Sequence, residues 1–393
     1  MTNVDRWLLP DGVEEILPGQ ALQIERIRRE LLDLYRLWGY EFVIPPLMEF
    51  TDSLLGLGQD LDLMTFKVTD QLSGRTLGIR ADITPQTARM DAHSLYRQGA
   101  NRLCYAGHVL FTKPKTPLTT RAPIMSGVEL YGEAGLDADA EVLSLLFEAL
   151  ATLGLKETSV EIGHVGIFRA LMNVVNLNLS QQAELFDLLQ RKAQAETLVW
   201  VKENIKNDVL AKMICDLPRM AGDRTCLSDA KDKLKNISPE VVVAIEELED
   251  LADIIQRRYP SSQLYFDLSE PHSFDYHTGI VFSVFAPGFG RSLASGGRYD
   301  HVGEVFGRAR PATGFSLDVT AVNQLLNIPV NKKMGVFVLV NEDASQWEAI
   351  QALRAKGETV ICGFSESEVV REEVLCDRQL SFANGKYVVE AWK

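Results

Sequence analysis

Helix-like and strand-like segments follow one another in an irregular order along this chain. Residues 171–260 are polar and helix-favouring, as in QQAELFDLLQRKAQAE, without a strand signal of comparable strength. Short β-rich runs precede this stretch and resume after it. The regular strand and helix alternation that is typical of parallel sheets is missing. The order therefore predicts an α+β fold, with a mixed or antiparallel sheet and a helical insertion at about 171–260.

A linker-like break, Asn327-Ile-Pro-Val-Asn, divides the chain into two predicted domains. Residues 1–325 form the large domain, which contains the helical insertion. Residues 326–393 contain the apolar run MGVFVLVN, a helix-like SQWEAIQALRAKG and a hairpin signal at Asn384-Gly385. They predict a small α/β domain. From Asn327 onward, eight basic residues stand against ten acidic ones, a net charge of −2, so the composition shows no basic face.

Composition narrows the classes of partner. The chain has 393 residues and a formal net charge of −14, which repels nucleic acid at long range, so we expect no nucleic-acid partner. No run of apolar residues is long enough for a membrane span, and the N-terminus has no basic flank, which favours a cytoplasmic protein.

Cysteine and histidine usage argues against a metal or disulfide framework. The five cysteines are widely spaced and form no C-x-x-C pair, and the six histidines are scattered. His272 and His277 are the nearest histidine neighbours, but they lack the helical spacing of a metal motif. We expect no metal site and no cofactor.

Two segments frame the large domain. The helix-periodic residues 21–38 are followed by YEFVIPPLMEF, whose Pro45 and Pro46 cannot donate to a sheet ladder and so belong at an edge or an interface. Further on, Tyr105 to Leu130 predicts a strand, a Pro/Thr-rich loop and a second strand. This frame would suit a polyanion, yet its loop carries few groups able to bind one.

In this order, these segments resemble the catalytic core of class II aminoacyl-tRNA synthetases, and specifically histidyl-tRNA synthetase, over most of residues 1–325. GYEFVIPPLME is similar to the first class motif, whose proline lies at the dimer interface. YAGHVLF and SGVE have the layout of the second motif, and SGGRYDHVGEVFG with PATGFSLDVTAV that of the third. FDYHTGIVF resembles a histidine-specific motif. The resemblance implies a class II synthetase-like antiparallel sheet.

The chain departs from the synthetase pattern at four charged positions. Where the second motif carries an arginine and a glutamate, this chain has Phe111 and Lys113. Ala321 replaces the arginine of the third motif, and His272 replaces an arginine of the histidine-specific motif. An arginine makes charge-assisted hydrogen bonds worth about 1.5–3 kcal/mol each to a phosphate. Loss at all four positions predicts that adenylate chemistry has been abandoned, leaving no catalytic residues.

The positions that face the amino acid in the synthetases are retained. The resemblance places Asp82 and Thr84 at the substrate ammonium and Glu129 opposite the bound histidine. It implies a histidine pocket with five further residues: Tyr105, Arg121, Tyr276, His277 and Tyr299. Plainer readings stay open for some of them. Asp82 is favourable near any helix N-terminus, and the two tyrosines Tyr276 and Tyr299 could be core residues.

A histidyl-tRNA synthetase-like core without its arginines resembles the regulatory subunits of ATP phosphoribosyltransferase, which are non-catalytic synthetase paralogues. This resemblance implies that the chain joins the short-form catalytic subunit at the first step of histidine biosynthesis. There it would activate the enzyme and confer feedback inhibition by histidine. It also implies a homodimer within a hetero-octamer of four regulatory and four catalytic chains. Two alternatives remain: an active histidyl-tRNA synthetase, and a histidine sensor for another partner.

Overall fold

The structure is a computed structural model that describes residues 7–54, 59–114, 116, 119–269, 276–326, 334–363 and 374–392. The chain forms two compact units, Met1–Asn327 and Ile328–Lys393. In the described part of the chain, no helix is long and apolar enough to cross a membrane.

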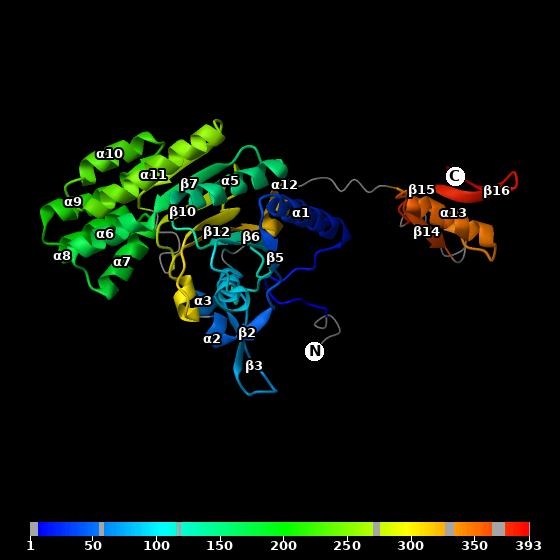
Figure 1. Cartoon of the computed structure of the whole chain (residues 1–393), viewed down its shortest axis with the longest axis horizontal. Coiled ribbons are helices and arrows are strands. Elements are labelled where there is room, and N and C mark those ends of the chain that lie inside the picture. The colour runs from blue at the N-terminus through cyan, green and yellow to red at the C-terminus, as the bar shows by residue number, and fades with distance from the viewer. Residues whose placement is uncertain are drawn as a thin grey trace. The chain divides into compact units, whose positions relative to one another are not determined.

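The first unit is built on a nine-stranded sheet (Figure 1). In spatial order its strands are β1 (Glu41–Phe42), β5 (Asn101–His108), β6 (Ile124–Tyr131), β12 (Ala312–Asp318), β11 (Ala294–Arg298), β10 (Ile280–Phe285), β7 (Ser159–His164), β9 (Gln263–Asp267) and β8 (Ala221–Gly222). Neighbouring strands are antiparallel except for the pairs β1–β5 and β7–β9. The sheet is therefore mixed and mainly antiparallel, and the predicted α+β class is confirmed.

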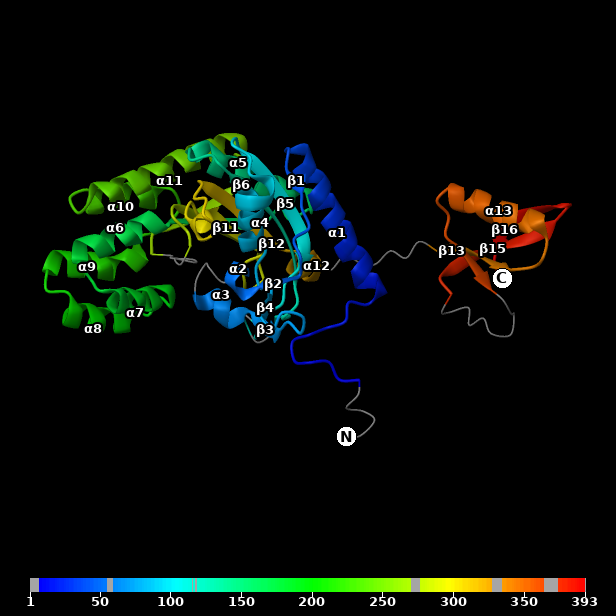
Figure 2. The same cartoon turned by 60° about the horizontal axis from the view of Figure 1, so that its bottom comes forward.

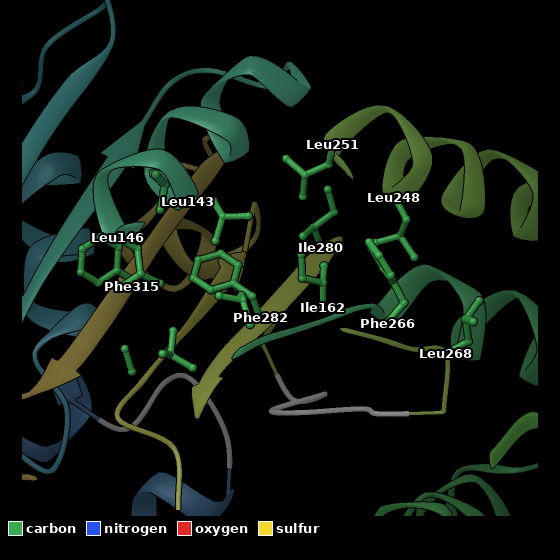
Figure 3. Close-up of a cluster of buried hydrophobic side chains, with 14 of the residues drawn as sticks. Leu143, Leu146, Ile162, Leu248, Leu251, Phe266, Leu268, Ile280, Phe282 and Phe315 are labelled. Atoms are coloured by element: carbon green, nitrogen blue, oxygen red, sulfur yellow. The ribbon is translucent and has the colours of Figure 1, made fainter. Parts of the chain in front are cut away.

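Helices cover one face of this sheet. Helix α1 (Pro18–Leu37) packs against β5 and lies beside α12 (Val319–Leu326), while α5 (Leu136–Thr152) packs on β12 (Figure 2). Helix α11 (Pro239–Arg258) packs against β7. Figure 3 shows the resulting core, in which Leu143 and Leu146 of α5 lie over the strands that carry Phe282 and Phe315. Burying each such side chain contributes roughly 1.5–3 kcal/mol, so this packing holds the helices on the sheet.

The region 171–260 contains mainly helices. They follow α6 (Val165–Val175) and gather beside the β7 end of the sheet (Figures 1 and 2). They are α7 (Leu179–Gln190), α8 (Gln194–Asn204), α9 (Asp208–Asp216), the short helix η3 (Leu217–Arg219), α10 (Thr225–Leu234) and α11. The two-residue strand β8 also lies in this region and pairs with β9. No strand was expected there, because two residues are too few to show a periodicity.

The opposite face of the main sheet carries the segments between β1 and β5. They are a three-stranded antiparallel sheet, β2 (Met48–Phe50), β4 (Thr76–Ile79) and β3 (Phe66–Thr69), with the helices α2 (Thr51–Leu54), α3 (Gln59–Met64), α4 (Thr84–Arg89) and the π-helix η2 (Met90–Leu95). Pro45 and Pro46 separate β1 from β2, which belong to different sheets. Arg80 donates to the carbonyl of Pro45 and Gln86 to that of Pro46, so buried donors hold the proline pair.

The second unit has a four-stranded sheet in the order β14 (Val360–Gly363), β13 (Gly335–Leu339), β15 (Cys376–Ala383) and β16 (Lys386–Ala391), with one described helix, α13 (Ala344–Ala355). The pairs β13–β14 and β13–β15 are parallel. Strands β15 and β16 form an antiparallel hairpin whose turn is Asn384-Gly385, both with positive φ. This is the hairpin that the sequence predicts, because asparagine and glycine tolerate that conformation.

Candidate functional site

Glu129 lies in the middle of β6, on the face of the sheet opposite the helical core. Its neighbours Val128 and Leu130 belong to the main core, and alternate residues of a strand point to opposite faces. The side chain is buried, with 1% of the residue exposed. Across the ladder stands Gly314 of β12, where a Cβ atom would come within 2.0 Å of the Glu129 carboxylate. A glycine is therefore needed there to leave room for the acid.

Three hydroxyl groups donate hydrogen bonds to the Glu129 carboxylate. The Thr84 hydroxyl lies 2.9 Å from Oε1 and the Tyr105 hydroxyl 3.2 Å from the same oxygen. The Tyr299 hydroxyl donates to Oε2. Burial raises the pKa of Glu129 well above its usual range, although the hydrogen bond from Thr84 opposes that shift. These four residues, predicted from sequence to share a pocket, form one hydrogen-bonded cluster.

A threonine followed by a proline is typical of a helix N-cap, but Thr84 does not cap α4. Helix α4 begins at Thr84 itself, and the Asp82 carboxylate accepts a hydrogen bond from the Thr84 backbone N–H at 3.1 Å. The threonine hydroxyl is thereby free to reach Glu129. Asp82 and Glu129 form no ion pair with any described residue, and the charge of Asp82 raises the pKa of Glu129 further. Among the described residues, two acids thus lie close together without a cationic partner, and such an arrangement can accept hydrogen bonds from a cationic or N–H-rich group.

An aromatic wall borders this cluster. The rings of Tyr276 and His277 are stacked with centroids 4.3 Å apart, and both meet the Tyr299 ring edge-on, at 6.0 and 6.1 Å. Burial raises the pKa of the Tyr276 hydroxyl well above its usual range. Behind the wall, Gly297 has φ +156°, and a Cβ there would come within 2.9 Å of the His277 ring. The aromatic group is thus fitted closely against β11.

The structure places Arg121 away from the acids. Its Nε donates to the carbonyl of Phe111 at 3.0 Å, and its Nη1 donates to the carbonyl of Asp11 at 3.1 Å. The Arg121 backbone N–H also donates to the Gly12 carbonyl at 2.7 Å. Arg121 therefore ties the N-terminal segment to the loop between β5 and β6, and its hydrogen bonds do not reach the Glu129 cluster.

Comparison with known proteins assigns the chain to a family. Residues 12–322 match the family model described as histidyl-tRNA synthetase, and residues 333–390 match the one described as ATP phosphoribosyltransferase subunit HisZ C-terminal domain. A protein of Cellvibrio japonicus named ATP phosphoribosyltransferase regulatory subunit is 57% identical over 99% of this chain and 98% of its own length. A protein of the same name from Teredinibacter turnerae is 52% identical over the full length of both chains. The chain belongs to the ATP phosphoribosyltransferase regulatory subunit family.

Solved structures agree with the family assignment. A Bacillus halodurans protein, titled ATP phosphoribosyltransferase regulatory subunit/histidyl-tRNA synthetase, superposes with a TM-score of 0.84 at 29% identity over 95% of this chain and 96% of its own. Histidyl-tRNA synthetase from Nostoc has a TM-score of 0.78 at 18% identity, covering 98% of this chain and 97% of its own, which shows the shared fold alone. The predicted class II synthetase-like fold is confirmed.

In this chain, buried apolar side chains stand at two positions where the synthetase motifs carry arginine. Phe111 is 6% exposed and belongs to an apolar cluster with Ile83 and Val109. Ala321 is fully buried beside Leu293. Lys113, at the glutamate position, is exposed on the loop. His272, the fourth departure, lies outside the described residues. Ala321 has no exposed surface, so a long charged side chain at this position would need the neighbouring residues to move.

A cavity of about 230 Å³ is lined in part by Phe111. Its lining is mainly apolar and hydroxyl-bearing, and its charged members are Arg291 and Asp318. The Arg291 guanidinium donates to the Asp318 carboxylate at 2.7 Å. The sequence does not predict this pair, because Arg291 lies in a loop outside every motif and nothing in its spacing points to β12.

Proposed function

We propose that this chain is the regulatory subunit of a two-component ATP phosphoribosyltransferase. It would join the short-form catalytic subunit, raise its activity and make it sensitive to histidine. The names of the relatives support the assignment to this enzyme. The observation that carries the histidine part is the Glu129 cluster, a buried acid with neutral hydroxyl partners next to a second acid. The resemblance to the synthetases implies that these positions face the amino acid.

The proposed ligand is histidine, bound by its two kinds of N–H group. Glu129 and Asp82 would accept hydrogen bonds from the α-ammonium and the imidazole, and a charge-assisted bond is worth about 1.5–3 kcal/mol. Tyr276, His277 and Tyr299 would pack against the ligand, while Thr84 and Tyr105 orient the Glu129 carboxylate. For Arg121 we now propose only a structural role outside the pocket, since its guanidinium donates to the backbone carbonyls of Phe111 and Asp11.

We also propose that the chain consumes no histidine. Phe111 and Ala321 supply no hydrogen-bond donor from their side chains, so the α-phosphate of ATP and the leaving pyrophosphate would find no arginine at these positions. A pocket that holds an amino acid without activating it is suited to report its concentration. Histidine-dependent exchange of pyrophosphate into ATP would instead favour the alternative of an active synthetase.

The proposed assembly is a homodimer of this chain within a hetero-octamer in the cytoplasm. Four large apolar side chains, Phe42, Ile44, Leu47 and Met48, are 44–79% exposed on the first unit, around β1 at the edge of the main sheet. A two-fold contact would cover each patch with its symmetry mate. A histidine sensor for a different partner shares the pocket, so a direct test with the catalytic subunit separates the two functions.

Isothermal titration calorimetry with histidine tests the proposed pocket. Glu129→Gln keeps the shape of the side chain but removes its negative charge, and we expect affinity to fall about 10- to 150-fold. Glu133→Gln is the matched control, because the same change is made four residues away at an exposed position. If the two variants bind histidine equally well, the ligand site lies elsewhere.

A further inference from the structure

Asp318 occupies the corner of the 230 Å³ cavity where β12 ends and α12 begins. One carboxylate oxygen accepts a hydrogen bond from the Ala321 backbone N–H at 2.8 Å, in the first turn of α12. The other oxygen accepts from Arg291 at 2.7 Å. The Asp318 side chain is 10% exposed and that of Arg291 23%, so the ion pair is largely shielded from water.

Two features that commonly bind anions therefore meet at this corner. Backbone N–H groups at a helix N-terminus favour negative charge, and a guanidinium pairs well with phosphate or carboxylate oxygens. Here the Ala321 N–H and the Arg291 guanidinium both already donate to the Asp318 carboxylate. The rest of the lining includes Phe111 and the hydroxyl residues Thr119, Thr120 and Ser316, and no described lining residue besides Arg291 is basic.

We propose that Asp318 is a specificity-determining residue that serves as the resident anion of this cavity and excludes phosphate-bearing ligands from it. A phosphate entering the cavity would meet a like charge at short range, and it could pair with Arg291 only by breaking an existing ion pair. Neutral molecules that hydrogen-bond to hydroxyl groups meet neither obstacle. The exclusion depends on no property of the Glu129 cluster and goes beyond the proposed function.

The test converts the cavity into an anion site in the full-length chain. Asp318→Asn removes the charge but keeps an oxygen able to accept from the Ala321 N–H, since asparagine is a good helix cap. Calorimetry with inorganic pyrophosphate is expected to show no binding by the wild-type chain up to the highest concentration used. The variant should bind with a dissociation constant at least about tenfold below that concentration. Adding Arg291→Gln to the Asp318→Asn variant should abolish the gain.

Two controls make the result decisive. Glu129→Gln removes a negative charge from the neighbouring site, and it should gain no pyrophosphate binding. Asp318→Ser also retains a capping oxygen and serves if the asparagine variant does not fold, as judged by circular dichroism. Pyrophosphate binding by the wild-type chain at the affinity of the Asp318 variant would overturn the proposal. A folded Asp318 variant without any gain in binding would overturn it as well.

Discussion

At Glu129, the needs of the proposed binding site and of stability oppose each other. The carboxylate is fully buried among neutral hydroxyls, and this burial raises its pKa well above the ordinary value of 4.5. A folded state that holds the proton more tightly than the unfolded chain loses stability as pH rises. The contribution of Glu129 is thus fully present below pH 4.5 and is lost as pH rises through the folded-state pKa.

This linkage predicts how Glu129→Gln changes stability in the absence of histidine. The variant cannot ionise at this position. As pH rises from the unfolded-state pKa of Glu129 to its folded-state pKa, the stability of the variant relative to the wild-type chain should therefore increase by about 1.4 kcal/mol per pH unit. Thermal unfolding followed by circular dichroism over a pH series measures the difference. Glu133→Gln, at an exposed position, should show no such trend. A constant difference between Glu129→Gln and the wild-type chain at every pH would contradict the account.

Sequence reasoning at this scale depended on motif position. It grouped Thr84, Tyr105, Glu129 and Tyr299, which the structure joins by hydrogen bonds, although their role toward histidine stays a prediction. It did not foresee the partners of Arg121. A long guanidinium can reach several carbonyls, and the one it uses at Asp11 lies far away in sequence. Such choices depend on tertiary contacts that no local pattern encodes.

At the scale of elements, a buried ion pair fastens α5 to β11. The Arg298 guanidinium donates to the Asp139 carboxylate at 2.7 and 3.0 Å, and also to the carbonyls of Glu133 and Gly135. Burial raises the pKa of Asp139, and the neighbouring Arg298 opposes this rise. Removing one partner of such a pair leaves the other charge buried without compensation.

Arg298→Gln should therefore be strongly destabilising, by about 3–5 kcal/mol. Urea unfolding followed by tryptophan fluorescence would measure the loss. Arg26→Gln is the matched control: Arg26 pairs with Glu30 on the surface of α1, with 75% of its side chain exposed, and its loss should have little effect. Equal effects of the two substitutions would show that the buried pair does not hold α5 in place.

The elements themselves were predictable where their patterns are long. Helix α1 and the strands β5 and β6 lie where the periodicity places them. The run SVEIGHVGIF, residues 159–168, is typical of a single strand, yet β7 ends at His164, whose Nδ1 accepts the Gly166 backbone N–H at the start of α6. A histidine cap is not visible in hydrophobic periodicity, so the sequence pattern alone does not place this strand end.

At the scale of the whole molecule, the exposed apolar patch around β1 predicts that the chain is a dimer. Each large apolar side chain removed from water contributes roughly 1.5–3 kcal/mol. Ile44→Asp should produce a monomer in sedimentation velocity experiments, because Ile44 is 79% exposed within the patch. Leu72→Asp is the control, since Leu72 is 98% exposed at the turn between β3 and β4, outside the patch. A monomeric wild-type chain, or a dimeric Ile44 variant, would contradict the prediction.

The most direct test of the proposed function is the rate of phosphoribosyl transfer from phosphoribosyl pyrophosphate to ATP, measured with the short-form catalytic subunit from the same genome. The account predicts that this chain raises the rate and that histidine lowers it again, with a coupling of about 1–3 kcal/mol. With Glu129→Gln, activation should persist while inhibition requires more histidine, since we expect assembly to use surfaces outside the pocket. Absence of a complex in gel filtration, together with a rate that changes with neither the chain nor histidine, would contradict the regulatory function.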